Sequence, residues 1–193
     1  MPVLHRPAPA WFERLAFVLV RPSHPGNVGA VARAMRTMGL RRLVVVAPRD
    51  PEVLTDPEAV ARASGADDVL RRAVLARDLS EALAPFTLAV AVSAEAREFG
   101  PVPEPPEDVA PVVRAALLAE PQAQAAFVFG TERTGLSVED ALLCQRMCST
   151  KKCRSSSLTA AVERRRALAG DAAATATVPI AMRVSTNASS TRS

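Results

Sequence analysis

The feature that most constrains the fold is an alternation of short apolar runs with longer amphipathic runs along residues 15–143. The apolar runs are rich in valine and leucine, which is typical of strands buried on both faces of a parallel sheet. We expect strands at residues 15–20, 43–47, 69–72, 88–92 and 125–129, and helices at residues 27–39, 57–64, 79–83, 106–118 and 138–143. This order predicts an α/β fold with a mostly parallel sheet and helices on both faces.

A glycine-containing segment follows the first expected strand and reads Asn-Val-Gly-Ala-Val-Ala-Arg-Ala-Met-Arg-Thr-Met-Gly-Leu from Asn27 onward. Gly26 and Gly29 predict a tight turn from strand to helix, where exposed backbone N–H groups attract anions such as phosphate. Arg33 lies off the expected core face and can bind a phosphate or a ribose. The alternative is that the glycines only shape a loop and that Arg33 is solvated. The core face expected for this helix consists of Val31, Met35 and Met38.

A second glycine loop, Gly-Thr-Glu-Arg-Thr-Gly-Leu at residues 130–136, follows the last expected strand. Parallel sheets gather their sites at the carboxyl ends of strands, so we expect both glycine loops to face one crevice. Glu132 either orders this loop or meets a polar ligand group, and the alternative is a carboxylate that stabilises a helix start. Ser137 and Asp140 predict a cap for the helix that follows.

Three segments, in this order, resemble the SPOUT class of RNA methyltransferases, in its TrmH-like family, and the first and last of them resemble its motifs one and two. They are Ser-His-Pro-Gly-Asn-Val-Gly-Ala-Val-Ala-Arg-Ala-Met at residues 23–35, Ala-Ser-Gly-Ala-Asp-Asp-Val-Leu at residues 63–70 and Phe-Gly-Thr-Glu-Arg-Thr-Gly-Leu at residues 129–136. The resemblance is strongest to the TrmJ branch, which methylates tRNA, and it runs from about Phe17 to about Cys144.

The resemblance implies a SPOUT-type α/β-knot fold and methyl transfer from S-adenosylmethionine to a ribose 2′-hydroxyl of tRNA, at pyrimidine 32 of the anticodon loop. It also implies a homodimer, because sites of this family borrow residues across subunits. Arg33 matches the arginine of the first motif, which orients ribose and phosphate and stabilises the developing alkoxide. It is not a simple base, because an arginine keeps its proton in proteins. Asn27 matches the asparagine of that motif, which orders the loop and the arginine.

The same resemblance supplies candidate residues for binding the cofactor. The second motif gives Gly130, Glu132, Gly135 and Leu136. Ser93 and Ala94 end the fourth expected strand, in a segment that borders the cofactor in the family; the alternative is that they only end the strand. Residues 98–106 then hold four prolines and predict an extended surface connector. A partial match to the third motif gives Ser156, Ser157 and Leu158.

After Cys144 the chain departs from the family pattern. Thr159 stands where the third motif has asparagine, and no strand-like run precedes the serines. This departure leaves open whether the knot closes, and it supports an alternative function, a catalytically impaired RNA-binding relative with a damaged cofactor pocket. We therefore expect an N-terminal leader at residues 1–14, a methyltransferase domain at residues 15–150 and a divergent, largely disordered tail, rich in alanine and serine, at residues 151–193.

The net charge of +4 comes from the tail, because residues 151–193 hold eight basic against two acidic side chains. Residues 1–150 hold sixteen basic and eighteen acidic side chains, so an RNA-binding surface there must come from local clusters. The alternative is that these charged side chains are only solvated, which is usual for charged surfaces. We expect RNA contacts from Arg33, Arg36, Arg41 and Arg42, and a second cluster is formed by Arg71, Arg72 and Arg77.

Other classes of protein are disfavoured. An unrelated doubly wound nucleotide-binding protein would need a phosphate loop of the G-x-G-x-x-G or G-x-x-x-x-G-K type, and neither occurs. Cys144, Cys148 and Cys153 have no histidine near them in sequence, which favours free thiols over a metal site. No apolar run is long enough to cross a bilayer, and residues 1–14 lack the apolar core of a secretion signal. We therefore expect a cytoplasmic protein with neither membrane nor metal partners.

Overall fold

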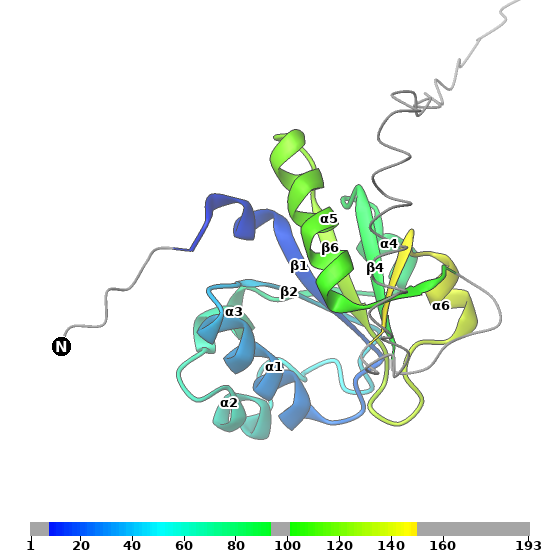
Figure 1. The fold of residues 1–193 in the computed structure, drawn as a ribbon. Helices are drawn as coiled ribbons and strands as arrows, with labels where there is room; N and C mark the ends of the chain where they lie inside the picture. Colours follow the sequence, from blue (N-terminus) through cyan, green and yellow to red (C-terminus); the bar gives the residue numbers. More distant parts are fainter. Residues whose placement is uncertain (1–7, 94–100, 150–193) are drawn as a thin grey trace, which may run out of the picture. The chain divides into compact units, whose positions relative to one another are not determined.

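A seven-stranded parallel sheet forms the centre of the molecule (Figure 1). The computed structural model describes residues 8–93 and 101–149 of the chain. The strands are arranged in the order β3-β2-β1-β6-β4-β7-β5, and all six neighbouring pairs run parallel. Their bounds are β1 (Leu15–Val20), β2 (Arg42–Val46), β3 (Val74–Ala76), β4 (Leu88–Ser93), β5 (Pro103–Glu104), β6 (Ala125–Phe129) and β7 (Arg146–Ser149). The predicted parallel α/β architecture is confirmed.

Helices cover both faces of this sheet, as predicted. Alternate residues of β1 point to opposite faces, so Leu15 and Leu19 belong to one buried cluster and Val18 and Val20 to another. The first cluster includes residues of α1 (Pro25–Thr37), α2 (Pro57–Ala63), α3 (Asp67–Arg72) and α5 (Pro106–Ala119). The second includes residues of α4 (Leu79–Leu83) and α6 (Val138–Leu142). A short 3-10 helix, η1 (Ala10–Arg14), leads into β1.

Side chains that accept hydrogen bonds from free backbone N–H groups set the start of four helices. His24 accepts from Gly26 at the start of α1, and Asp56 accepts from two N–H groups of α2. Asp78 and Ser137 do the same for α4 and α6. Because α1 begins at Pro25, two residues before the predicted start, Asn27 lies inside its first turn.

The prediction of a strand at residues 69–72 is wrong, because these residues form the end of α3. The acidic pair Asp67 and Asp68 in the first turn and the basic pair Arg71 and Arg72 in the last turn complement the helix dipole. The strand of this region begins two residues after α3 as β3 and pairs with β2.

Two further strands lie where none was predicted. The expectation that no strand precedes the serines is wrong, because β7 lies between β4 and β5 in the sheet. Its register pairs Val90 with Arg146 and Ser93 with Ser149. The edge strand β5 occupies two residues of the proline-rich stretch that was predicted as a connector. Both strands are short. β7 pairs with β4 on one side and with β5 on the other.

Gly26 and Gly29 lie within helical backbone of α1, so the prediction that they form the turn is wrong. A Cβ atom on Gly29 would lie 2.0 Å from the carbonyl oxygen of Ala59, so this glycine allows α1 and α2 to approach closely. The turn after β1 is made by Arg21, whose φ of 49° is in the left-handed region. The buried face of α1 also differs from the expected one and consists of Gly26, Val28, Gly29, Ala32 and Met35.

Several predictions concern residues outside the described ranges. These are the closure of the knot, the divergent tail at residues 151–193, part of the leader at residues 1–14, and the candidate cofactor residues Ala94, Ser156, Ser157 and Leu158.

Candidate functional site

The two glycine-containing segments meet through one carboxylate, that of Glu132. The strands that precede them are neighbours, and Leu19 of β1 lies opposite Phe129 of β6 at their carboxyl ends. Glu132 Oε2 accepts hydrogen bonds from the Ser23 hydroxyl at 2.6 Å and from the Ser23 backbone N–H at 3.2 Å. Its Oε1 accepts from the Asn27 side-chain amide at 2.9 Å. The predicted meeting of the two segments at one edge of the sheet is confirmed.

These hydrogen bonds stabilise the ionised form of the Glu132 carboxylate. Partial burial by itself would raise the pKa of Glu132, but the bonds from Ser23 and Asn27 outweigh it and lower the pKa to about 2. Of the roles considered for Glu132, the structure shows the ordering of the loop. The start of α6 is capped instead by Ser137 and Asp140, as predicted.

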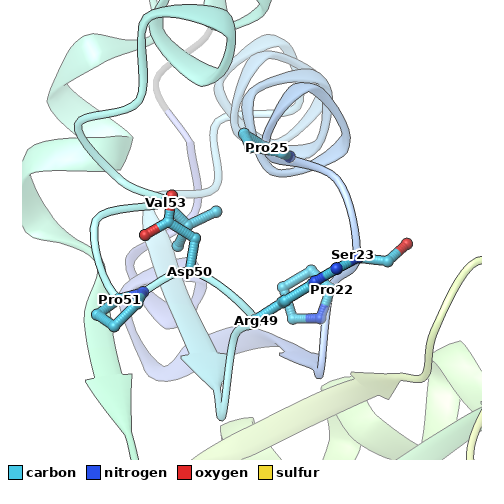
Figure 2. A pocket seen from close by; sticks show the side chains of 7 residues that line it. All are labelled: Pro22, Ser23, Pro25, Arg49, Asp50, Pro51 and Val53. Atoms are coloured by element: carbon cyan, nitrogen blue, oxygen red, sulfur yellow. The ribbon is translucent and has the colours of Figure 1, made fainter.

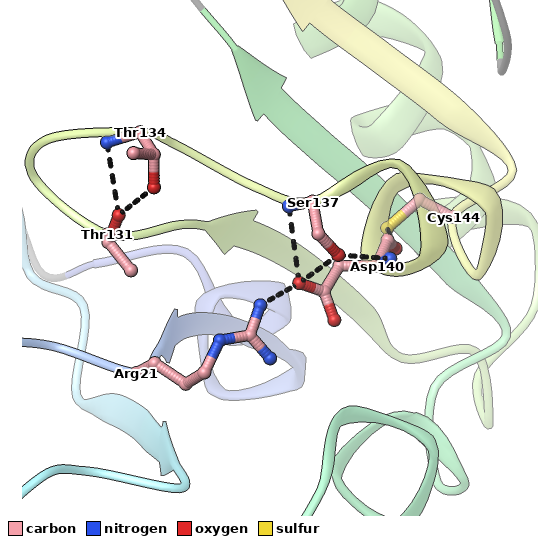
Figure 3. Close-up of polar contacts among 6 residues, drawn as sticks. All are labelled: Arg21, Thr131, Thr134, Ser137, Asp140 and Cys144. Carbon is pink, nitrogen blue, oxygen red and sulfur yellow. Dashed lines mark hydrogen bonds and ion pairs between the residues drawn. The ribbon is translucent and has the colours of Figure 1, made fainter.

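A second link joins the same two parts of the chain (Figure 3). The Arg21 guanidinium, directly after β1, pairs with the carboxylate of Asp140 in the first turn of α6. The Ser137 hydroxyl donates to this carboxylate at 2.8 Å and accepts from the Asp140 backbone N–H at 3.1 Å. Burial would raise the pKa of Asp140, but the bonds from Arg21 and Ser137 lower it below its ordinary value. Residues 21–27 and 130–140 are thus tied together at two points.

The loop at residues 130–136 folds back on itself. The backbone N–H and carbonyl groups of Thr131 and Gly135 exchange two hydrogen bonds of 3.1 and 2.9 Å, and the Thr131 and Thr134 hydroxyls lie 2.7 Å apart (Figure 3). A Cβ atom on Gly130 would lie 1.9 Å from the carbonyl carbon of Gly135, and Gly135 has a φ of 69°. Leu136 is buried beneath the loop. The two glycines therefore serve the shape of the loop itself.

An apolar cavity of about 270 Å³ lies between α1 and the ends of β1 and β6. Asn27, Gly130 and Glu132 contribute to its lining. Its apolar walls include Phe17, Leu19, Val31, Met38 and Phe129. Val31 and Met38, which were expected in the core, therefore face this cavity, and Met38 is exposed.

Arg33 does not line this cavity. Successive residues of a helix are about 100° apart, so Arg33 lies roughly 240° around the axis of α1 from Asn27, which lines the cavity. Its side chain is exposed and makes no hydrogen bond or ion pair with any residue that the structure describes. The structure thus brings Asn27 and Glu132 together and leaves Arg33 available to a group outside this part of the chain.

The other arginines predicted to contact RNA have partners within the chain. Arg36 and Arg41 both pair with Asp68, and Arg36 also donates to the Gly65 carbonyl oxygen. Burial would raise the pKa of Asp68, but these two arginines lower it overall. The Arg42 guanidinium donates to Gln124 and lies 4.8 Å above the Phe86 ring. The four arginines therefore do not act as one free basic cluster.

A second cavity, of about 390 Å³, was missed by the sequence reasoning (Figure 2). It lies between residues 22–25, after β1, and residues 49–53, after β2. Pro22, Ser23 and Arg49 are among the residues that line it. The Pro-Arg-Asp-Pro run after the second apolar strand was the available signal, because it ends at the same sheet edge as the two motifs.

The remaining predicted groups are buried. Ser93 is the last residue of β4 and is 7% exposed. Cys144 and Cys148 are free thiols, and burial raises the pKa of Cys144 to about 12 and also raises that of Cys148. Among residues 8–93 and 101–149, no group of three His, Cys, Asp or Glu side chains could hold a metal ion. None of the helices in these ranges is long and apolar enough to span a membrane.

Known proteins match most of this chain in sequence and in structure. The sequence model of the SpoU rRNA Methylase family matches residues 14–162, so the resemblance extends beyond Cys144. A probable methyltransferase from Bordetella pertussis Tohama I has a crystal structure that superposes with a TM-score of 0.68 at 45% identity. The match covers 81% of this chain and 93% of that one.

Several relatives carry the name TrmJ. The tRNA (cytidine/uridine-2′-O-)-methyltransferase TrmJ of Pectobacterium atrosepticum is 44% identical over 133 residues, which are 68% of this chain and 52% of the relative. The crystal structure of TrmJ from Z. mobilis ZM4 superposes with a TM-score of 0.62 at 32% identity, covering 71% of this chain and 58% of that one. The chain thus spans about half the length of the curated relatives that it matches. With the family match over residues 14–162 and the two motifs joined at Glu132, the chain belongs to the SpoU rRNA Methylase family.

Proposed function

We propose that this protein is an S-adenosylmethionine-dependent tRNA methyltransferase of the cytoplasm, which methylates the ribose 2′-hydroxyl of pyrimidine 32 in the anticodon loop. The names of the TrmJ relatives support the substrate and the reaction. The observation that carries the proposal is the pair of hydrogen bonds by which Glu132 holds Ser23 and Asn27, because it assembles the two motifs at one sheet edge.

The residues present fit the cofactor. Ser93 ends β4 and Gly130 follows β6, and these strands are neighbours, with Val92 opposite Phe129. The carboxyl ends of adjacent parallel strands are where nucleotide-like ligands bind in such sheets. Ser93 and the loop residues Gly130, Glu132, Gly135 and Leu136 would therefore hold S-adenosylmethionine. When bound, this cofactor supplies the electrophilic methyl group.

The protein's own residues then have two tasks. Methyl transfer needs the 2′-oxygen in line with the methyl group at near-attack distance, which is a matter of positioning. Asn27 and Glu132 meet this need by fixing the first turn of α1 against the loop at residues 130–136. The second task is to stabilise the negative charge that develops on the 2′-oxygen as the hydroxyl gives its proton to a water molecule, since Arg33 cannot accept it. Arg33 suits it because its guanidinium stays charged and unpaired within the described ranges, so it can hold the neighbouring phosphate.

The proposal is tested by incubating the protein with radiolabelled S-adenosylmethionine and a tRNA transcript, and by mapping 2′-O-methyl groups. We expect Arg33→Ala to lower kcat at least about 100-fold, the size of effect seen when one charge-stabilising donor is lost, without changing the unfolding midpoint. Arg114→Ala, at an exposed arginine of α5 outside both basic clusters, is the matched control and should keep full activity. Methyl transfer by Arg33→Ala at the wild-type rate would refute the catalytic assignment.

A homodimer forms part of the proposal. Arg33 projects away from the cavity beside Asn27 and Glu132, which agrees with action at the site of a second subunit. Light scattering gives the oligomeric state. If Arg33 acts across subunits, mixing Arg33→Ala with a cofactor-loop variant such as Gly130→Ala should restore activity that neither variant has alone. No recovery in mixtures shown to exchange subunits would place Arg33 in its own subunit's site.

A second candidate is a catalytically impaired relative that still binds RNA. It is favoured by Thr159, which stands where the third motif has asparagine. Calorimetry with S-adenosylmethionine separates the two, since micromolar binding supports the enzyme and the absence of detectable heat supports the impaired relative.

A further inference from the structure

The cavity between the ends of β1 and β2 has rigid, largely apolar walls. Three prolines, Pro22, Pro25 and Pro51, and the buried Val53 form much of its lining (Figure 2). Prolines have fixed φ angles, so these walls need little ordering when a ligand enters. Its volume of about 390 Å³ lies within the roughly 300–1,000 Å³ common for small-ligand pockets.

The polar groups of the cavity carry opposite charges. Arg49 is exposed, and its guanidinium makes no hydrogen bond or ion pair within the described ranges. Figure 2 shows its side chain extending from the loop after β2 toward Pro22. Asp50 accepts the Glu52 backbone N–H at Oδ1, at 2.9 Å, and keeps Oδ2 as an acceptor. A free anion would meet repulsion from Asp50, whereas a nucleotide offers a phosphate to Arg49 and hydroxyl or amino donors to Asp50.

This cavity shares a wall with the candidate site. Ser23 lines it, and the Ser23 hydroxyl donates to Glu132, which also holds Asn27. Pro22 lines both this cavity and the apolar cavity beside α1. A nucleotide bound here therefore lies next to the residues that are to position the reacting ribose.

We propose that this cavity is a binding subsite for a nucleotide of the substrate RNA that neighbours the methylated one, with Arg49 contacting its phosphate. The inference rests on the proposed function, because it takes RNA as the substrate. It adds Pro22, Arg49, Asp50 and Pro51, which lie outside both family motifs, and Pro25 of the first motif to the residues that recognise this RNA. Arg49 here binds substrate and takes no part in the methyl transfer.

The test measures tRNA binding without requiring catalysis. Fluorescence anisotropy gives the binding constant of labelled tRNA at several salt concentrations for the wild type, Arg49→Ala, Arg49→Lys and Arg114→Ala. A lost phosphate contact should lower the slope of log K against log salt by about 0.7 to 0.9. We expect this change, with weaker binding at low salt, for Arg49→Ala only. Arg49→Lys should keep the slope, because it keeps the charge.

Arg114→Ala is the matched control, because Arg114 is an exposed residue of α5 that belongs to neither basic cluster and lines neither cavity. Unfolding midpoints should be equal for all four proteins, since neither arginine has a described partner. An Arg49→Ala slope equal to that of the wild type would overturn the subsite, even if the protein methylates tRNA. A changed slope in a protein that transfers no methyl group would support the subsite and refute the proposed activity.

Discussion

Arg21 and Asp140 form an ion pair that connects the end of β1 to the first turn of α6, although 119 residues separate them in the sequence. The pair is asymmetric, because the Asp140 side chain is 10% exposed and the Arg21 side chain 47%. Asp140 also caps α6 through Ser137, so one carboxylate fixes both the helix start and its place against β1. Together with the contact between Asn27 and Glu132, this pair holds the loop at residues 130–136 from both sides.

Removing the Arg21 side chain should destabilise the protein. Arg21→Ala leaves the mostly buried Asp140 carboxylate with Ser137 alone, and loss of one bond to a buried charge costs about 1 to 2 kcal/mol where the partner is partly solvated. Ala and Arg bear similar strain at a φ of 49°, so the backbone term largely cancels. Urea unfolding measures the difference. Arg72→Ala should stay within about 0.5 kcal/mol of wild type, and an equal loss in both variants would show that the pair contributes nothing.

The stability of the protein should fall in acid partly through Glu132. The pKa of this group is about 2 in the folded protein, against an ordinary value of 4.5. The folded state therefore binds the proton less readily than the unfolded state, and the stabilisation is complete above about pH 5 and is lost as pH falls toward 2. Urea midpoints recorded across this range should decline less steeply for Glu132→Gln than for wild type.

Ser23→Ala should weaken the same acid dependence, since it removes one donor to Glu132. Ser80→Ala is the control, because Ser80 is an exposed hydroxyl on α4 without a hydrogen bond among the described residues. If Ser23→Ala and Ser80→Ala decline alike, then Ser23 does not set the pKa of Glu132.

A methyl group on Gly29 should separate α1 from α2. Its Cβ would lie 2.0 Å from the Ala59 carbonyl oxygen, a backbone atom that cannot move without displacing α2. Overpacking of this kind costs about 1 to 3 kcal/mol. Thermal or urea unfolding of Gly29→Ala tests it against Ala30→Ser, a change on the exposed part of the same turn that should cost about 0.5 kcal/mol. Wild-type stability in Gly29→Ala would mean that the helices are not in close contact.

Cys144 and Cys148 should resist alkylation in the folded protein. With the pKa of Cys144 near 12, only about one molecule in ten thousand carries its thiolate at pH 8. Mass spectrometry of peptides after iodoacetamide treatment should show both cysteines unmodified in buffer and modified in urea. Rapid labelling of Cys144 in buffer would contradict its burial.

The sequence allowed the parallel sheet and most element positions to be predicted, because hydrophobic periodicity reports burial directly. Strand β1 and helix α4 lie where they were expected, at Leu15–Val20 and Leu79–Leu83. The segment at residues 69–72, which was wrongly predicted as a strand, is too short for its hydrophobic repeat to distinguish a helix from a strand. Strand β7 was missed because only Met147 and Cys148 of its four residues are apolar, and its pairing with Val90 of β4 is not visible locally.

The meeting of the two motifs was predictable from the rule that sites gather at the carboxyl ends of parallel strands. The particular contacts were not, because they depend on side chains far apart in sequence. Arg41 pairs with Asp68 and Arg42 with Gln124, which lies 82 residues away, so a local cluster of arginines gave no sign that its charges were already matched. The place of Arg33 outside the cavity followed only from the helix geometry of α1.

Because Ser23 and Asn27 share the carboxylate of Glu132, the two hollows at this edge of the sheet are mechanically coupled. We therefore expect a ligand that displaces Ser23 in one of them to weaken the hold of Glu132 on Asn27 in the other, because both side chains donate to the same carboxylate.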